Sequence, residues 1–234
     1  MTRRRVRGVL FDAAGTLIRP RVPVGETYSA HAKAPGAAVS AWRLDDAFRR
    51  VMAKAPPMAF PEVPPAERPE RERDWWRRVV RQTFLAADSA VRPADFEALF
   101  DGLFRHYAAP EAWQVCDGAA EALRALRASG RVVAVVSNFD GRLPALLDGL
   151  GLGDLLDGVF LPGDTGAAKP DPAIFQAAAR RLDLSLADCV YVGDHPEQDV
   201  AAARSVGMGA IDVGELATLA DLPKRIDDVS GPAA

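Results

Sequence analysis

The stretch that decides the fold runs from Arg7 to Leu17 and reads Arg-Gly-Val-Leu-Phe-Asp-Ala-Ala-Gly-Thr-Leu. A short apolar run ends in one carboxylate, Asp12, and the chain can turn at Gly15. A buried strand that stops at an acid presents that acid at the carboxyl edge of a sheet, where open α/β folds bind their ligands. The alternative is an aspartate that only opens a surface turn. The rest of the chain decides between the two.

The bulk composition is that of an ordinary globular protein. The chain has 234 residues, of which 49% are hydrophobic and 26% are charged, and its formal net charge is -3. This length suits one large domain or two small ones, and the small negative charge creates no field that would attract nucleic acid. No apolar run approaches the roughly 20 residues that span a bilayer. We therefore expect a cytoplasmic protein that binds neither nucleic acid nor membrane.

From Trp113 onward, short apolar runs alternate with helical patterns. Together with the first run, they predict strands at 6–11, 132–136, 158–161, 189–192 and 210–213, and helices at 118–128, 143–150, 172–182 and 199–206. Apolar strands that alternate with helices form a parallel sheet covered on both faces. The predicted fold class is therefore α/β, a Rossmann-like parallel sheet with helices on both faces. The polar tail after Pro223 is expected to fray.

Between the first strand and Trp113 the strand pattern disappears. Helical periodicity predicts helices at 24–34, 44–55, 67–87 and 93–107, with a proline-rich connector at 56–65. The third helix carries an apolar stripe typical of a core, formed by Trp75, Trp76, Val79, Val80, Phe84 and Leu85. The predicted organisation is a sheet domain at 1–19 and 113–234, with an all-helical domain inserted at 20–112 after the first strand.

Polar residues gather where the predicted strands stop. They are Asp12, Ser137, Asn138, Lys169 in a loop before a helix, Asp194 and Asp199. In a parallel sheet these strand ends lie at one edge, so the set should converge in space.

The types of residue in this set suit phosphate chemistry. Carboxylate oxygens bind a hard divalent ion such as Mg²⁺, and Lys169 can hold a phosphate oxygen as a point charge. The hydroxyl or the backbone of Ser137 can donate to another phosphate oxygen. A carboxylate that faces the phosphorus, such as Asp12, can act as nucleophile and form an aspartyl-phosphate.

Four stretches resemble, in order and spacing, the four motifs of the haloacid dehalogenase-like hydrolases. They are Phe-Asp-Ala-Ala-Gly-Thr-Leu at 11–17, Val-Ser-Asn at 136–138, Lys-Pro-Asp-Pro at 169–172, and Gly-Asp at 193–194 followed by Asp199. The helical insert at 20–112 resembles the mobile cap domain of that family. Further stretches, at 24–28, 75–76, 82–84, 113–115 and 137–140, resemble one branch of it, the rhythmically-expressed-gene-2-like proteins.

The resemblance implies a Mg²⁺-dependent hydrolase that acts on a small phosphorylated metabolite, as a monomer or homodimer. It implies that Asp12 is the nucleophile. Ser137, Asn138 and Lys169 would bind the phosphoryl group, and Ser137 and Lys169 would also take part in catalysis. The metal ligands implied are the carboxylates of Asp12, Asp194 and Asp199 and the backbone carbonyl of Ala14.

Ala14 departs from the pattern of the family's phosphatases, which usually carry an aspartate there. The resemblance implies that the missing residue is the general acid-base, which protonates the leaving oxygen and then activates water. Its loss should lower the reaction rate by about two to four orders of magnitude for a substrate with a poor leaving group. Acyl phosphates, whose leaving group needs no proton, should therefore be preferred. A cap residue could replace the acid, the candidates being Glu26, Tyr28, His31 and Lys33; the alternative for these four is a solvated helix face.

Three other functions stay open on the sequence. Dehalogenases of the family also lack the second aspartate, but they need no metal, so Asp194 and Asp199 argue against carbon–halogen cleavage. Phosphonoacetaldehyde hydrolases carry alanine at the Ala14 position and use a cap lysine as a Schiff base, for which Lys33 and Lys54 are the candidates. The chain could also be a catalytically weak phosphate- or Mg²⁺-binding or regulatory module.

Overall fold

The computed structural model describes residues 6–32, 39–90, 93 and 95–229. The chain divides into two compact units. The sheet unit contains the residues up to Arg19, Ala59–Glu62 and the residues from Val115 onward, and the helical unit contains Pro20–Met58 and Val63–Gln114. Part of the proline-rich connector thus groups with the sheet unit. Lys33, one of the candidate cap residues, lies outside the described residues.

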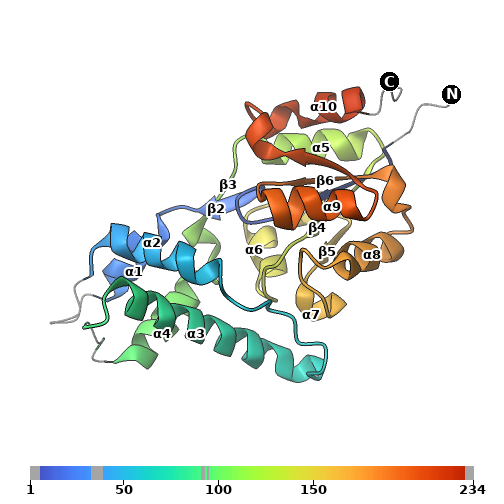
Figure 1. The fold of residues 1–234 in the computed structure, drawn as a ribbon. Coiled ribbons are helices and arrows are strands. Elements are labelled where there is room, and N and C mark those ends of the chain that lie inside the picture. Colours follow the sequence, from blue (N-terminus) through green and yellow to red (C-terminus); the bar gives the residue numbers. More distant parts are fainter. Residues whose placement is uncertain (1–5, 33–38, 91–92, 94, 230–234) are drawn as a thin grey trace. The chain divides into compact units, whose positions relative to one another are not determined.

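The sheet unit is built on five parallel strands in the order β5-β4-β1-β6-β7 (Figure 1). Their bounds are Gly8–Phe11 (β1), Val132–Val136 (β4), Gly158–Phe160 (β5), Cys189–Gly193 (β6) and Gly209–Asp212 (β7). The first strand is central, with Leu10 in register with Ala134 on one side and Tyr191 on the other. Because β1, β4 and β6 are buried from both faces, they read as unbroken apolar runs. The predicted α/β fold with a parallel sheet is confirmed.

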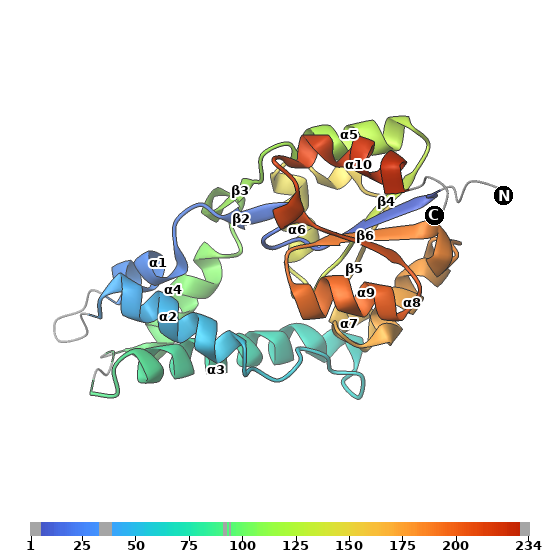
Figure 2. The ribbon, with the colours of Figure 1, turned by 45° about the horizontal axis from the view of Figure 1, so that its top comes forward.

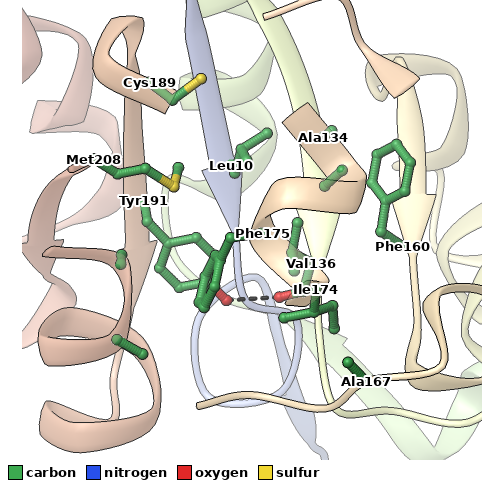
Figure 3. Close-up of a cluster of buried hydrophobic side chains, with 13 residues drawn as sticks. Leu10, Ala134, Val136, Phe160, Ala167, Ile174, Phe175, Cys189, Tyr191 and Met208 are labelled. Atoms are coloured by element: carbon green, nitrogen blue, oxygen red, sulfur yellow. Dashed lines mark hydrogen bonds between the residues drawn. The ribbon is translucent and has the colours of Figure 1, made fainter. Parts of the chain in front are cut away.

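Helices cover both faces of this sheet. Figure 2 shows α5 (Ala119–Ala128) and α10 (Leu222–Val229) on one face and α8 (Pro172–Arg181) and α9 (Ala202–Ser205) on the other. The shorter helices of the sheet unit are α6 (Leu143–Gly149) and α7 (Pro162–Thr165), with 3-10 turns at Gly153–Leu155, Leu186–Asp188, Val213–Glu215 and Leu219–Asp221. The core between α8, α9 and the strands centres on Leu10, Phe175 and Tyr191 (Figure 3).

The helical unit consists of α1 (Val24–His31), α2 (Ala41–Met52), α3 (Arg68–Ala87) and α4 (Phe96–His106), with 3-10 turns at Pro65–Glu67 and Pro110–Ala112. Its core is rich in aromatic rings. Tyr28 stacks on Phe84 with ring centroids 5.9 Å apart, and Phe100 and Leu103 of α4 are buried in the same cluster. Where the structure describes the chain, no helix is long and apolar enough to cross a membrane.

The structure corrects several local predictions. The segment after Pro223 is predicted to fray, but residues up to Val229 belong to the helix α10. Leu222 and Ile226 lie one helical turn apart, and both are buried where α10 packs against α5. Two short strands, Ile18–Pro20 (β2) and Trp113–Val115 (β3), pair where the chain leaves and re-enters the sheet unit. The sequence missed both because three residues are too few to show a period. Leu85 is 43% exposed and does not belong to the core stripe of α3.

Candidate active site

The predicted site residues meet at the carboxyl edge of the sheet. Asp12 follows β1, Ser137 follows β4 and Asp194 follows β6, and β1 lies between the other two strands. After β1 the chain builds β4 and β5 on one side and then returns to build β6 and β7 on the other. Such a topological switch point opens a crevice at the strand ends. The convergence predicted from the sequence is therefore a consequence of strand order.

Two glycines let the carboxylates approach the chain. Gly15 has a φ of 100°, and a Cβ there would lie 2.4 Å from Oδ2 of Asp194. A Cβ on Gly193 would lie 2.4 Å from Oδ2 of Asp199. Side chains at these positions would collide with the acids, so the Gly-Thr turn after β1 and the glycine that ends β6 are steric requirements of the site.

Lys169 is the centre of the buried part of the site. Its ammonium donates to Oδ1 of Asp12 at 2.8 Å, to Oδ1 of Asp199 at 2.6 Å and to the hydroxyl of Tyr191 at 2.8 Å. Burial alone would lower the pKa of Lys169, but the charges of Asp12 and Asp199 outweigh it and raise that pKa. A lysine ammonium has three N–H donors, so all of them are used.

Asp199 joins the lysine to the loop after β6. Its Oδ2 accepts hydrogen bonds from the backbone N–H groups of Asp194 at 3.2 Å and His195 at 3.0 Å, while Oδ1 binds Lys169. Asp199 lies in a π-helical turn, Pro196–Ala201, that precedes α9, where a regular α-helix starting at 199 was predicted. Such turns are frequent at functional sites, and this one turns a buried carboxylate back toward the strand ends.

The side-chain amide of Asn138 holds the main chain of Lys169. Its Oδ1 accepts the Lys169 N–H at 2.7 Å, and its Nδ2 donates to the Lys169 carbonyl at 2.8 Å and to Oε1 of Gln198 at 3.4 Å. Both hydrogens of the amide are thus used within the protein. Ser137 is buried, and its N–H donates to the carbonyl of Phe160 at 3.1 Å.

Three carboxylates, those of Asp12, Asp194 and Asp199, offer oxygen atoms that all lie within 4.8 Å of one another. Burial, and then the negative charges of Asp12 and Asp199, raise the pKa of Asp194. Like charges held this close repel one another unless a cation lies between them. Ala14, next to this group, is exposed and its methyl group carries no proton-transfer function.

The described candidates for the replacement acid lie in the helical unit and differ in how exposed their side chains are. Glu26 is exposed on α1, and His31 is exposed with its Nδ1 2.9 Å from the carbonyl of Thr27. Tyr28 is only 2% exposed and its ring lies in the aromatic core, so it is not on the solvated face offered as the alternative. Lys54, a candidate Schiff-base lysine, is exposed in the turn after α2.

Two residues of the site were missed on the sequence, Tyr191 and Gln198. Tyr191 lies within the apolar run of β6, where a tyrosine reads as a core aromatic residue. The available signal was its hydroxyl, because a buried tyrosine usually finds a polar partner for that group. Burial, and then the charges of Asp12 and Asp199, raise the pKa of Tyr191 well above its ordinary value, so its hydroxyl stays protonated.

The structure thus joins a parallel α/β sheet to a buried lysine among three carboxylates at its carboxyl edge. The model of the haloacid dehalogenase-like hydrolase family matches residues 6–207. The chain belongs to this family, which confirms the resemblance seen in the four motifs.

Relatives support the same assignment at the level of the branch. Haloacid dehalogenase-like hydrolase domain-containing protein 3 of Homo sapiens is 38% identical over 207 residues, which cover 88% of this chain and 81% of the human protein. Rhythmically expressed gene 2 protein of Drosophila melanogaster is 30% identical over 211 residues, covering 87% of this chain and 81% of the fly protein. The resemblance to the rhythmically-expressed-gene-2-like branch is therefore confirmed.

Solved structures share the fold. A structure described as a dehalogenase superposes with a TM-score of 0.65 at 24% identity, over 91% of this chain and 87% of that one. A HAD phosphatase from Thermococcus onnurineus superposes with a TM-score of 0.58 at 23% identity, over 94% and 97%. Because a dehalogenase and a phosphatase both share the fold, the fold does not choose between their reactions.

Proposed function

We propose that this hydrolase is a Mg²⁺-dependent phosphohydrolase that acts on a small phosphorylated metabolite through an aspartyl-phosphate on Asp12. The observation that carries the proposal is the buried contact of Lys169 with both Asp12 and Asp199, beside the carboxylate of Asp194. The lysine neutralises part of the carboxylate charge and leaves an oxygen-rich edge. That combination suits a cation and a phosphoryl group better than a neutral organic substrate.

The donor set fits magnesium. Carboxylate oxygens from three residues within 4.8 Å of one another are hard ligands. Burial, and then the charges of Asp12 and Asp199, raise the pKa of Asp194, and a cation would offset the repulsion between these charges. Asp12, Asp194 and Asp199 would hold the ion, together with the backbone carbonyl of Ala14. When bound, the ion would supply positive charge that offsets the negative charge of the phosphoryl oxygens.

The reaction divides into two displacements at phosphorus. A carboxylate oxygen of Asp12 forms a bond to phosphorus, and the bond from phosphorus to the leaving oxygen breaks with its electron pair going to that oxygen. Water then attacks the same phosphorus, the bond to Asp12 breaks with its electron pair returning to the carboxylate, and the two hydrogens of the water leave on the released phosphate. Lys169 and Ser137 would hold the phosphoryl oxygens. For Lys169 this requires that one of its three present hydrogen bonds be given up or shared.

Asn138 supports this arrangement through the main chain of Lys169. The direct contact with a phosphoryl oxygen predicted from the sequence would require its amide to leave Lys169 or Gln198. In the proposed enzyme Asn138 therefore holds the lysine loop, and the phosphoryl group is bound mainly by Ser137 and Lys169.

The methyl group of Ala14 sets the choice of substrate. An alkoxide leaving group needs a proton as it departs, and Ala14 has none to give. A carboxylate leaving group, as in an acyl phosphate, departs without one. The proposed enzyme is therefore slow with alkyl phosphates and selective for good leaving groups, unless a residue of the helical unit supplies the acid.

A phosphatase screen tests the proposal. Acyl phosphates, sugar phosphates and nucleotides would be assayed with Mg²⁺ and with EDTA, and Asp12→Asn would serve as the control. We expect Mg²⁺-dependent phosphate release from acyl phosphates and none from the variant. Ala14→Asp should raise turnover of an alkyl phosphate by about 10²- to 10⁴-fold. Unchanged turnover in that variant would contradict the role given to position 14.

Ala14 also favours two further candidates. The first is a catalytically weak phosphate- or Mg²⁺-binding module, which predicts that Asp12→Asn and the wild type behave alike in every assay. The second is hydrolysis without the second aspartate, either of a 2-haloacid or of a phosphonate. Halide release that EDTA does not affect would identify the former, and borohydride trapping of a lysine adduct with phosphonoacetaldehyde would identify the latter.

A further inference from the structure

Tyr191 lies directly beneath the charged groups of the site. Its side chain is fully buried, and its ring packs edge-on against Phe175 with the centroids 5.2 Å apart. Figure 3 shows its hydroxyl directed at the end of β4, where it donates to the carbonyl of Val136 at 2.6 Å. The same hydroxyl lies 2.8 Å from the ammonium of Lys169.

The direction of these two hydrogen bonds follows from a count of hydrogens. A tyrosine hydroxyl has one hydrogen, and the carbonyl of Val136 can only accept, so the hydrogen points there. Toward Lys169 the hydroxyl therefore presents a lone pair, which accepts one N–H of the ammonium. The packed ring and the Val136 carbonyl leave the oxygen little freedom to move.

We propose that Tyr191 is a positioning residue that fixes the ammonium of Lys169 for the reaction at Asp12. The proposal rests on the proposed phosphohydrolase function. Asp12 and Asp199 hold two of the three N–H groups, and both carboxylates accept through Oδ1. Tyr191 supplies the third acceptor from the protein interior and adds no further negative charge. Asn138 fixes the main chain of the same lysine, so its two ends are held independently.

Tyr191→Phe removes the acceptor and keeps the ring. The third N–H of Lys169 would then be buried without a partner, which is unfavourable. The ammonium should move away from β6 toward the crevice, where water can accept that hydrogen. A displacement of about 1 Å can cost about 10²-fold in rate, so we expect kcat to fall by about 10- to 100-fold with KM changed less than about threefold.

Tyr107→Phe is the matched control. Tyr107 directly follows α4 in the helical unit. The variant makes the same chemical change there, and Tyr107 belongs to none of the proposed machinery. We expect its kcat to equal that of the wild type. A merely structural role for Tyr191 would lower the melting temperature but leave kcat unchanged for the folded enzyme, and that result would overturn the proposal.

A double variant tests whether Tyr191 acts through Lys169. In the Lys169→Met background, adding Tyr191→Phe should lower kcat by less than about twofold, because the group it positions is already absent. A further fall equal to that seen in the wild-type background would overturn the proposal.

A readout independent of turnover separates this proposal from the proposed function. Crystal structures of the wild type and of Tyr191→Phe would compare the distance from Nζ of Lys169 to Oδ1 of Asp12, which is 2.8 Å here. A displaced ammonium in a protein that releases phosphate from no substrate of the screen, acyl phosphates included, would overturn the proposed function and support the positioning. An unmoved ammonium would overturn the positioning whatever the activity.

Discussion

Two groups of charged side chains, one in each unit of this protein, differ in how they are placed. In the sheet unit, Lys169 is 5% exposed and its ammonium lies between two buried carboxylates. In the helical unit, arginines of α3 are half-buried or exposed and lie over aromatic rings of α4. Arg77 lies 4.9 Å from the ring centroid of Phe100, and Arg81 lies 4.1 Å from that of Phe96.

This difference indicates what each set of charges is for. Taking an ion pair out of water costs several kcal/mol per ion, and well-packed apolar residues would often give equal or better stability. An exposed arginine pays little desolvation cost, because its stem packs on apolar surface while its head stays in water. The buried charges around Lys169 are therefore explained by chemistry, and the arginines of α3 that lie over the rings of α4 by packing.

Lys169→Met should have the largest effect, because it acts on both activity and stability. It leaves Asp12 and Asp199 buried without their cation, which should lower the free energy of unfolding by about 3–5 kcal/mol. Loss of one preorganised charge should lower kcat by about 10²- to 10³-fold. Thermal unfolding and phosphate release would measure the two effects. Added Mg²⁺ should restore part of the melting temperature lost by the variant. If the variant without Mg²⁺ melted at the same temperature as the wild type, the stabilising role of the buried charge pair would be contradicted.

Phe100→Ala tests the aromatic core of the helical unit. The ring is 1% exposed, so its removal should cost about 3–5 kcal/mol. Hydrogen exchange should accelerate in α1 and α4 while the amides of β1 and β6 stay protected. Phe175→Ala, the matched change in the sheet unit, should give the reverse pattern. Equal acceleration in both units after either change would show that they do not unfold separately.

Arg77→Met tests whether the surface charges of α3 act mainly through packing. The change removes the contact of the guanidinium with Phe100 and the ion pairs with Asp74 and Glu97, and it keeps an apolar stem. We expect a loss of only about 0.5–1 kcal/mol, measured by urea denaturation and reduced further in high salt. A loss comparable with that of Lys169→Met would contradict the contrast between the units.

The smallest expected effect concerns His106. Burial, and then the charge of His31, lower the pKa of His106 below its ordinary value of 6.5. The folded state thus prefers the neutral ring of His106. The contribution of this ring to stability is complete above its ordinary pKa of 6.5 and is lost as the pH falls below 6.5. Between about pH 7.5 and about pH 5.5, the wild type should lose more melting temperature than His106→Gln. An equal loss of melting temperature in both proteins would contradict the lowered pKa of His106.

The sequence predicted Asp12, Ser137 and Asp194 as site residues because each stands where an apolar run stops. Asp12 and Asp194 end apolar strands, and parallel strands bring such ends to one edge. The helix of Leu222–Val229 was missed because its two buried residues, Leu222 and Ile226, are too few to show a period beside a polar tail. Helix formation there depends on packing against α5.

By itself, the sequence determined the parallel sheet, the helical insert and the set of residues at the strand ends, because these follow from local apolar runs and from where they end. Only the tertiary structure decided how those residues are used. It placed Asn138 on the main chain of Lys169 and Tyr191 beneath its ammonium. These contacts join residues 22 or more positions apart, and a sequence pattern records no such distances. The hydroxyl of Tyr191 gains its role only where β6 lies between β1 and β7 and the ring packs against Phe175 of α8.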